Sequence, residues 1–395
     1  MAEHRYEVYA NRWDEPHIIE ELIPSRGLEA SFPLNDHGAA SFEATVEPGK
    51  SFWRPSIGLP ISGVLIARDG VPIWSGWVTD EDQTGERTFS FQCKEWGAFL
   101  EDKVPAIPWT YTDINDALIF RHQIEQAQAI VGQNLQIQTG TYLGAATSTR
   151  TINDWDDSTV GRELRAIGEA KGGPEWYVGT GGTMENPVRL LALADRHGHT
   201  TAQTTLEYVV DTEDYQTPEG PPVVRLLGSL FPGPAPLVPT RRAGGNLIAA
   251  KRRQSVSDAA TVAKATGSGE EKARLVRTAT ASRLLGFNWP RMTTTKAYSD
   301  VTVPATLQGH ADADLAATAG IATTYQLVSL DDDPDWTQTP RGSTVQVVLD
   351  TDVYGAERPV GGPDGFESRL FNTIVRQPDS GPAQVEWVTA TVEET

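Results

Sequence analysis

The sequence predicts a β-rich α+β protein of several domains, with β-structure at both ends of the chain and mixed structure between them. Three observations lead to this prediction. At 395 residues the chain is longer than one hydrophobic core usually organises, so about two to four domains are expected. Near both termini, apolar and polar residues alternate with a period of two, as in half-buried strands. Between the termini, apolar residues recur at helical spacing.

The first hundred residues are expected to form a small closed or nearly closed antiparallel β-domain. Residues 28–47 contain two alternating runs joined by the turn sequence NDHG, in which we expect Gly38 to take a positive φ. Residues 62–83 contain a hairpin around the sequence RDG, and residues 87–103 contain a strand followed by a short helical turn. A similar β-region is expected at the C-terminus, from residues 343–353 through the segments ESRLFNTIVRQ and AQVEWVTATVEE.

The region after the prolines of KVPAIPW is predicted to mix helices and strands. Residues 112–132 carry an apolar stripe at helical spacing, with Asp113 or Asn115 as the N-cap. Residues 156–173 carry a second stripe, and the segments PEWYVGTGG and PVRLLALAD then predict a hairpin. A third helix is expected from about Pro304.

Composition limits the class of protein. The chain carries 33 Lys+Arg and 53 Asp+Glu, a formal net charge of −20. Cys93 stands alone, so neither an intrachain disulfide nor a cysteine-based zinc site can form, which fits assembly in a reducing cytoplasm. No signal peptide is evident, and no apolar run approaches the roughly 20 residues that a membrane span needs. We therefore expect no stable membrane insertion and no cofactor.

The charge is unevenly divided along the chain. Residues 225–296 hold 13 of the 33 basic residues and 3 of the 53 acidic ones, so the remainder is strongly acidic. A Pro-rich stretch, residues 215–245, is predicted to be a long ordered arm or loop rather than a regular element, and the segment NLIAAKRRQSV after it begins as a strand. Five cations in this part of the chain form a candidate assembly contact: Arg241, Arg242, Lys251, Arg252 and Arg253.

These cations have three interpretations. Nucleic-acid-binding proteins usually place stacking aromatic residues among clustered cations, and none occurs between Arg241 and Arg283. A membrane-surface helix needs bulky apolar residues opposite its cations, whereas the residues here are mostly Ala and Thr. A contact with an acidic surface, on the same chain or on a neighbouring copy, needs no such residues and explains the division of charge, so we favour it.

Few residues suggest chemistry. The sequence has no nucleophile elbow, phosphate-binding loop or HExxH zinc motif. The acidic run 331–335 resembles the start of a calcium loop, but the required glycine and closing glutamate are missing, so a solvated acidic turn is favoured. Asp195, His197 and His199 could form the edge of a metal site, yet no fourth ligand is evident, and a loop is favoured.

Carbohydrate chemistry is also weakly supported. Paired carboxylates are too frequent in so acidic a chain to identify a glycosidase. Trp74 and Trp77 lie in one hairpin at odd spacing, so one should pack inward and the other outward. We favour core or interface aromatics over a sugar-stacking platform.

The order of these segments resembles a known family. The segments LNDHGAASFEATVE, GVLIARDGVPIWSGWVTD, FQCKEWGAFLEDK, DDSTVGRELRAIGEAKGGPEWYV and NLIAAKRRQSVSDAATVAKATGSG follow one another, and DDDPDW and GSTVQVVLDTD close the series. In this order the chain resembles the minor tail proteins of siphophages that infect actinobacteria, and through them the tail-hub (baseplate hub, tail-associated) proteins of long-tailed phages. The likeness extends over almost the whole chain, without one diagnostic motif.

The resemblance implies two small tail-tube-like β-barrels with an α+β middle region. The expected domains are an N-terminal barrel, an α+β domain, the Pro-rich arm with the first strands of the second barrel, an α+β excursion, and the strands that complete the second barrel. Their boundaries are 1–102, 103–205, 206–256, 257–325 and 326–395.

The same resemblance implies a function and partners. Similar proteins form homotrimers whose six barrels adapt the six-fold tail to a three-fold tip around the DNA exit channel. The expected partners are a distal tail ring protein and tip, fibre or tape-measure proteins, with genome DNA only in transit. We therefore expect a non-enzymatic virion protein, assembled in the host cytoplasm. The alternatives are a virion-associated cell-wall hydrolase and a carbohydrate-binding receptor module.

Overall fold

The structure is a computed structural model of the chain. The residues that it describes are 4–12, 19–47, 53–54, 57, 62–103, 108–130, 133–152, 159–170, 172–198, 202–208, 246–255, 259–269, 274–286, 291–299, 301–319, 322–349, 366–379 and 381–391.

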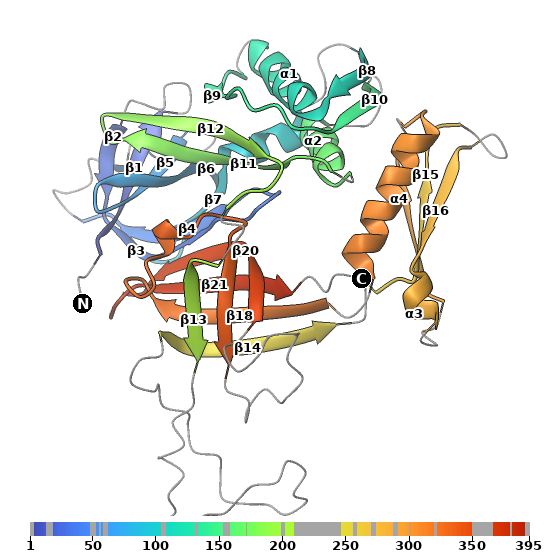
Figure 1. Cartoon of the computed structure of the whole chain (residues 1–395). Coiled ribbons are helices and arrows are strands. Elements are labelled where there is room, and N and C mark those ends of the chain that lie inside the picture. Colours follow the sequence, from blue (N-terminus) through green and yellow to red (C-terminus); the bar gives the residue numbers. More distant parts are fainter. Residues whose placement is uncertain are drawn as a thin grey trace, which may run out of the picture.

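One hydrogen-bonded sheet of 13 strands forms the centre of the described molecule (Figure 1). Its main path runs in the order β14-β18-β21-β20-β3-β4-β7-β6-β5-β1-β2, and β19 joins β20 to β13 beside this path. Neighbouring strands in this sheet are antiparallel, except that β13 and β19 are parallel. Both along the chain and across the sheet, the strands fall into two groups: an N-terminal half, β1 to β7, and a C-terminal half, β13, β14 and β18 to β21.

The N-terminal half contains the strands predicted from the first hundred residues. They are β1 (Tyr6–Arg12), β2 (Ile19–Ile23), β3 (Ser25–Ser31), β4 (Ala39–Thr45), β5 (Ser62–Arg68), β6 (Val71–Gln83) and β7 (Thr88–Glu95). The predicted RDG hairpin joins β5 to β6, with Asp69 and Gly70 both at positive φ. Only Pro24 separates β2 from β3, so the two strands follow one another almost without a break.

The C-terminal half contains strands from two distant parts of the sequence. They are β13 (Thr204–Tyr208), β14 (Leu247–Ser255), β18 (Ala322–Leu330), β19 (Thr344–Leu349), β20 (Phe366–Gln377) and β21 (Gln384–Thr391). β14 and β18 are neighbours, and Ser255 at the end of β14 lies opposite Ala322 at the start of β18. The residues between them therefore leave and re-enter the sheet at adjacent positions.

The two halves meet along β3 and β20. Ser31 lies opposite Ile374 and Leu28 opposite Gln377, so the ladder continues from one half into the other. A single hydrophobic core includes Phe42 and Trp74 from the first half and Trp387 from the second, all fully buried. The path of hydrogen-bonded strands does not return to its first strand, so the described strands form no closed barrel. The fold is therefore β-rich with several sheets, and its two β-halves share one core.

The middle region is α+β and has its own core. Its elements are η2 (Trp96–Asp102), β8 (Trp109–Asn115), α1 (Asp116–Ala129), β9 (Ile137–Gln138), β10 (Thr147–Ile152), α2 (Val160–Gly168), β11 (Glu175–Thr183) and β12 (Asn186–Ala194). β8 pairs with β10, while β11, β12 and β9 form a three-stranded sheet. Phe120 of α1, Ile167 of α2 and Trp176 of β11 are buried together.

The helix caps agree with the sequence. The Asn115 side chain accepts a hydrogen bond from the backbone N–H of Ala117, and Thr159 accepts one from Arg162, so the first two predicted helices are confirmed. Of the two predicted N-caps the structure has Asn115, so the first helix begins at Asp116. Residues before Asn115 form β8 because they pair with β10, and Asp113 has a positive φ that a helix does not tolerate.

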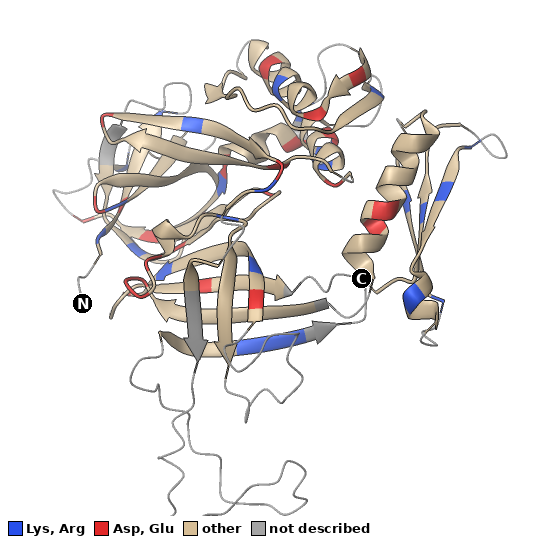
Figure 2. Cartoon of the chain, viewed as in Figure 1, with Lys and Arg blue, Asp and Glu red and all other residues tan. Residues whose placement is uncertain are grey.

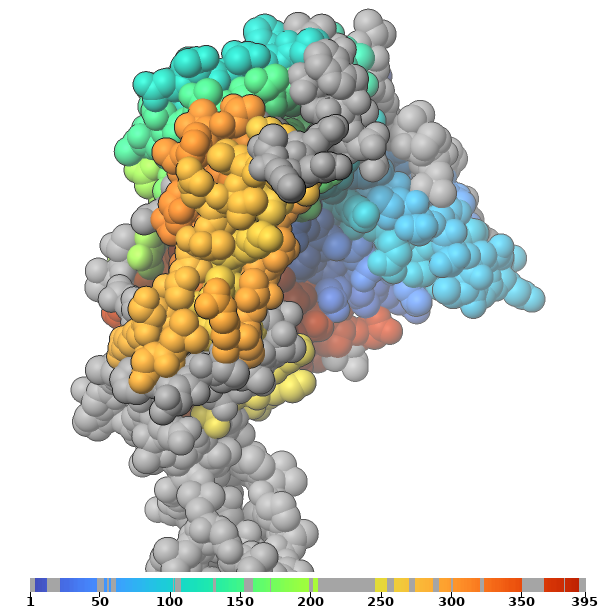
Figure 3. Space-filling model, turned by 90° about the vertical axis from the view of Figure 1, so that its right-hand side faces the viewer, coloured from blue at the N-terminus to red at the C-terminus, as the bar shows by residue number. Residues whose placement is uncertain are grey.

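The segment between β14 and β18 folds as a smaller α+β unit. Its elements are β15 (Val262–Thr266), β16 (Val276–Thr280), α3 (Ser282–Gly286), β17 (Thr293–Ala297) and α4 (Pro304–Thr318). The third predicted helix is therefore confirmed, with Pro304 in its first turn. α4 packs on the β16-β15-β17 sheet over a core that includes Tyr298, Leu307 and Ala311 (Figures 1 and 3). We call this unit the insertion.

The NDHG turn differs from its prediction. The residue at positive φ is Asn35, whose side chain and backbone bond to Trp176 of the middle region. Gly38 is required for a different reason, since a Cβ atom there would lie 2.3 Å from the carbonyl oxygen of Ser31. Its backbone N–H donates to a carboxylate oxygen of buried Glu95 at 2.6 Å. Close packing, rather than backbone conformation, fixes this glycine.

We expect Gly38→Ala to lower the free energy of unfolding by about 2–3 kcal/mol, because backbone atoms stand where the new methyl group would lie. Urea denaturation measures the change. Gly140→Ala is the matched control, since no atom lies within 4 Å of its Cβ position. Equal stability of the two variants would contradict the close approach.

Candidate assembly surface

The described cations of the candidate contact lie together on β14. Lys251, Arg252 and Arg253 occupy consecutive positions of this strand, at one end of the main path of the sheet (Figure 2). Arg241 and Arg242 lie outside the described residues. The strand predicted for NLIAAKRRQSV is thus present.

Side-chain alternation divides the three cations between two faces. Lys251 and Arg253 are exposed and lie opposite Gln326 and Thr324 of β18. Arg252 lies opposite Tyr325, which is buried in the core. Burial raises the pKa of the Tyr325 hydroxyl, and the neighbouring Arg252 acts in the opposite direction. Arg252 is thus engaged by its own chain, while Lys251 and Arg253 point outward.

The outward cations have neutral neighbours along the sheet. On β21, the next strand of the sheet, Val388 lies opposite Gln326 and Ala390 lies opposite Thr324. Within the described part of the chain, no carboxylate lies opposite either cation on these two strands. This differs from Arg376 on β20, which forms ion pairs with Glu29 on β3 and Glu386 on β21.

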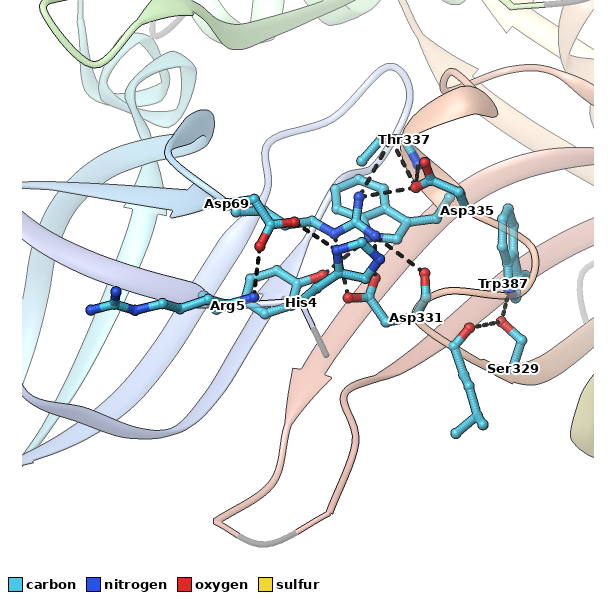
Figure 4. Close-up of polar contacts among 12 residues, drawn as sticks. His4, Arg5, Asp69, Ser329, Asp331, Asp335, Thr337 and Trp387 are labelled. Atoms are coloured by element: carbon cyan, nitrogen blue, oxygen red, sulfur yellow. Dashed lines mark hydrogen bonds and ion pairs between the residues drawn. The ribbon is translucent and has the colours of Figure 1, made fainter. Parts of the chain in front are cut away.

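The acidic run 331–335 is solvated only in part: Asp333 is exposed, but the interpretation as a solvated turn was wrong for Asp331. Asp331 is 4% exposed, and both of its carboxylate oxygens lie 3.3 Å from nitrogens of Arg68 at the end of β5 (Figure 4). Asp335 accepts a hydrogen bond from the same guanidinium at 2.9 Å. The acidic run neutralises a buried cation that comes from the other half of the sheet.

Two aromatic side chains complete this contact. The Tyr6 hydroxyl donates to Asp331 at 2.9 Å, and the indole N–H of Trp336 donates to the Tyr6 oxygen at 3.2 Å. Burial, together with the charge of Asp331, raises the pKa of Tyr6 far above its usual range. We call these five residues, Tyr6, Arg68, Asp331, Asp335 and Trp336, the Arg68 cluster. It joins β1 and β5 to the loop after β18.

A second polar junction joins both halves of the sheet to the middle region. Arg341 forms an ion pair with buried Glu95 at 2.9 Å and donates to the carbonyl of Pro33 at 3.0 Å. Its guanidinium lies 4.4 Å from the ring centre of Tyr177 on β11. Arg369 on β20 also pairs with Glu175 on β11. These contacts fix the middle region against the sheet.

An ion pair connects the insertion to the middle region. Lys296 on β17 lies 2.9 Å from Asp314 of α4 and 3.5 Å from Glu169, which follows α2. His310 of α4 is buried and stacks on Tyr298 with 4.0 Å between ring centres. Burial, together with the nearby positive charge of Arg150 on β10, lowers the pKa of His310 to about 4.

Asp195 and His197, the described residues of the considered metal edge, make contacts of other kinds. The Tyr142 hydroxyl donates to Asp195, and the backbone N–H of His197 donates to Glu175 at 2.7 Å. His199 lies outside the described residues. No group of three or more potential metal ligands occurs among the residues that the structure describes.

The tryptophans of the β6 hairpin are core residues, as favoured from the sequence. Trp74 is fully buried in the central core. Trp77 points to the opposite face and stacks on Trp96, with 5.8 Å between ring centres, against the core of the middle region. Separately, no helix in the described part of the chain is both long and apolar enough to cross a membrane.

The fold has counterparts among solved structures. No protein-family model matches the chain, and no curated protein matches it either. The tail protein from Neisseria meningitidis MC58 is similar in structure, with a TM-score of 0.57 and 12% identity over 98% of this chain and 96% of its own. The 43 kDa tail protein of prophage MuSo2 from Shewanella oneidensis has a TM-score of 0.55 and 11% identity, over 97% of this chain and 98% of its own.

A third counterpart is prophage tail protein gp18 from Listeria monocytogenes EGD-e. Its TM-score is 0.52 at 10% identity, over 98% of this chain and 95% of that protein. At these identities the likeness concerns the fold, and it includes nearly every described element of the chain.

We expect Asp331→Asn to lower the free energy of unfolding by about 3 kcal/mol, because it leaves Arg68 buried without one of its two carboxylates. Chemical denaturation measures the change, and Asp379→Asn, at an exposed position, is the matched control. A double-mutant cycle with Arg68→Met should show strong coupling. Additive effects of the two substitutions would contradict the cluster.

We expect His310 to make the protein less stable in acid. Its pKa is about 4 in the folded chain and about 6.5 unfolded, so the unfolded state binds the extra proton between these values. Stability relative to His310→Phe should therefore fall as the pH drops from about 6.5 to about 4, by on the order of 3 kcal/mol in total. Urea denaturation of both proteins over this pH range tests it, and parallel curves would contradict the burial of a neutral imidazole.

Proposed function

We propose that this chain is a structural, non-enzymatic protein of a phage tail, and more specifically a tail-tip hub subunit. The observation that carries the proposal is the likeness of its fold to three tail proteins, two of them from prophages, over at least 97% of the chain. The sequence resemblance to minor tail proteins of actinobacterial siphophages is an independent argument for the same class. Both likenesses extend over the whole chain rather than over one module.

In the proposed hub, each subunit contributes two tail-tube-like barrels and three subunits form the tip. The division of the main sheet into two halves supports this arrangement. In the first half, the single-residue link at Pro24 allows β2 and β3 to act as one bent strand that borders both β1 and β4. Six such barrels in a trimer would match the six-fold symmetry of a tail.

The proposed domains follow from the same arrangement. The first barrel corresponds to residues 1–102, the α+β domain to 103–205, and the excursion to 257–325. The arm with β14 (206–256) and the last strands (326–395) build the second barrel. The separate cores of the middle region and of the insertion support the two α+β units.

We propose that the subunit contacts a distal tail ring protein on one side and tip, fibre or tape-measure proteins on the other. DNA would pass through the channel without being bound, because a chain with a formal net charge of −20 repels a polyanion. The protein would be assembled in the host cytoplasm and remain in the virion at the tail tip. Its mechanical role is to match symmetry and to hold the channel closed until ejection.

The two alternatives receive no specific support from the described residues. A carbohydrate-binding platform would expose aromatic side chains, whereas Trp74 and Trp77 pack into the two main cores. A cell-wall hydrolase would need a carboxylate pair facing a substrate, whereas Asp331 and Asp335 bind Arg68.

We propose that the outward cations of β14 belong to the contact between subunits. Lys251→Glu with Arg253→Glu should weaken trimer formation at low salt without lowering the unfolding temperature, because both side chains are exposed. Light scattering gives the mass of the assembly in solution. The matched control is Lys264→Glu with Arg274→Glu, which changes the net charge equally at exposed positions of the insertion.

The same measurement tests the proposed function as a whole. A trimer of the unmodified protein, or a monomer that forms a trimer with its ring partner, would support a hub. A stable monomer that clears cell-wall material would overturn it. Intact trimers after reversal of both β14 cations would remove these residues from the contact.

A further inference from the structure

The C-terminal end of β6 carries three consecutive acidic residues. They mirror, with opposite charge, the three consecutive basic residues of β14. β6 extends over 13 residues, from Val71 to Gln83, but its partner β5 ends its pairing at Trp77, opposite Gly63. Beyond Trp77 the next residues of β6 pair with β7 alone among the described strands. The sequence of this extension is VTDEDQ, and three of its residues are acidic.

The acidic residues alternate between two faces in the same way as the cations. Asp80 and Asp82 are exposed and lie opposite Gln92 and Ser90 of β7. Glu81 lies between them, opposite buried Phe91, and forms an ion pair with Arg54. The inner acid is therefore engaged by its own chain, and the two outer acids point outward.

This end of β6 is accessible from outside. Residues 82–87, which form the tip of the β6–β7 hairpin, are all exposed. In Figure 3 the light-blue atoms on the right, in the colour that the bar gives to this part of the chain, project beyond the neighbouring surface. The hairpin tip can therefore reach another molecule.

We propose that β14 of one subunit lies against the acidic end of β6 of the next subunit, with Lys251 and Arg253 facing Asp80 and Asp82. The two cations are two residues apart on one strand, and so are the two acids. Because side chains two residues apart on a strand lie on one face at the same spacing, both pairs can form at once, whether the strands are parallel or antiparallel. Opposite charges directly across a strand pair are favourable, and like charges are not.

The partner is a second copy because one chain cannot make this contact with itself. Six strands lie between β14 and β6 in the main sheet, so seven spacings of about 4.8 Å, roughly 34 Å along the sheet, separate them. A contact between two different surfaces of identical subunits is heterologous, and such contacts close into rings when the rotation permits. This inference rests on the proposed function, since it names the surface that the β14 cations meet in the hub.

The test reverses the charges of the two β14 cations and of the two β6 acids, first separately and then together. Lys251→Glu with Arg253→Glu and Asp80→Lys with Asp82→Lys should each raise the dissociation constant of the assembly by about tenfold or more, because like charges then face one another. Combining all four substitutions restores opposite charges, so assembly should return to within about threefold of the unmodified protein. Analytical ultracentrifugation over a concentration series measures these constants.

Two controls separate the contact from a general effect of charge. Glu185→Lys with Asp379→Lys removes two exposed acids elsewhere and should leave assembly unchanged. Raising the salt from about 50 mM to about 500 mM should weaken the assembly of the unmodified protein and of the four-fold variant equally, because surface pairs are screened.

The outcomes distinguish this inference from the proposed function. Loss of assembly on reversal of the cations alone, with no effect of reversing the acids, would keep the hub and overturn the β6 contact. Failure of the four-fold variant to recover would also overturn it, provided that its unfolding temperature is unchanged. An unmodified protein that stays monomeric at every concentration, with and without its ring partner, would contradict both.

Discussion

The Arg68 cluster is the contact on which the arrangement of the two β-halves depends. A guanidinium that is 6% exposed cannot remain charged in an apolar core without carboxylates around it, and both of its carboxylates come from the loop after β18. The β3–β20 ladder and the shared core join the halves, and the cluster adds a charged contact between β5 and the loop after β18. Arg341 likewise pairs with buried Glu95 of the first half, and its guanidinium lies over Tyr177 of the middle region.

Local features of this fold could be predicted from the sequence, and long-range ones could not. Helix caps such as Asn115 and the turn glycine Gly70 act within a few residues, so their chemistry is visible in the sequence. The acidic run 331–335 was misinterpreted because its cation is 263 positions away, where nothing marks Arg68 as buried. The sequence left Asp113 and Asn115 as alternative caps of the first helix for a related reason, since β10, which holds the residues before Asn115 in a strand, comes later in the chain.

The candidate surface was predicted in part. The excess of positive charge around β14 could be read from composition, but the separation of Lys251 and Arg253 from Arg252 required the strand register. The acidic end of β6 was not noticed in the sequence, because Asp80 and Asp82 are two acids among 53. Their distinguishing property is that the partner strand β5 ends before them, which only the pairing of strands reveals.

The position of the insertion has a consequence for how such a chain can change over time. Ser255 and Ala322 lie opposite one another on adjacent strands, so the insertion begins and ends at points about 5 Å apart. A tight turn would close the same gap, and β14 and β18 would then form an ordinary hairpin. One small domain can therefore be exchanged for another at this site without changing the register of the sheet. A foreign domain grafted here would be carried on the outside of an unaltered core.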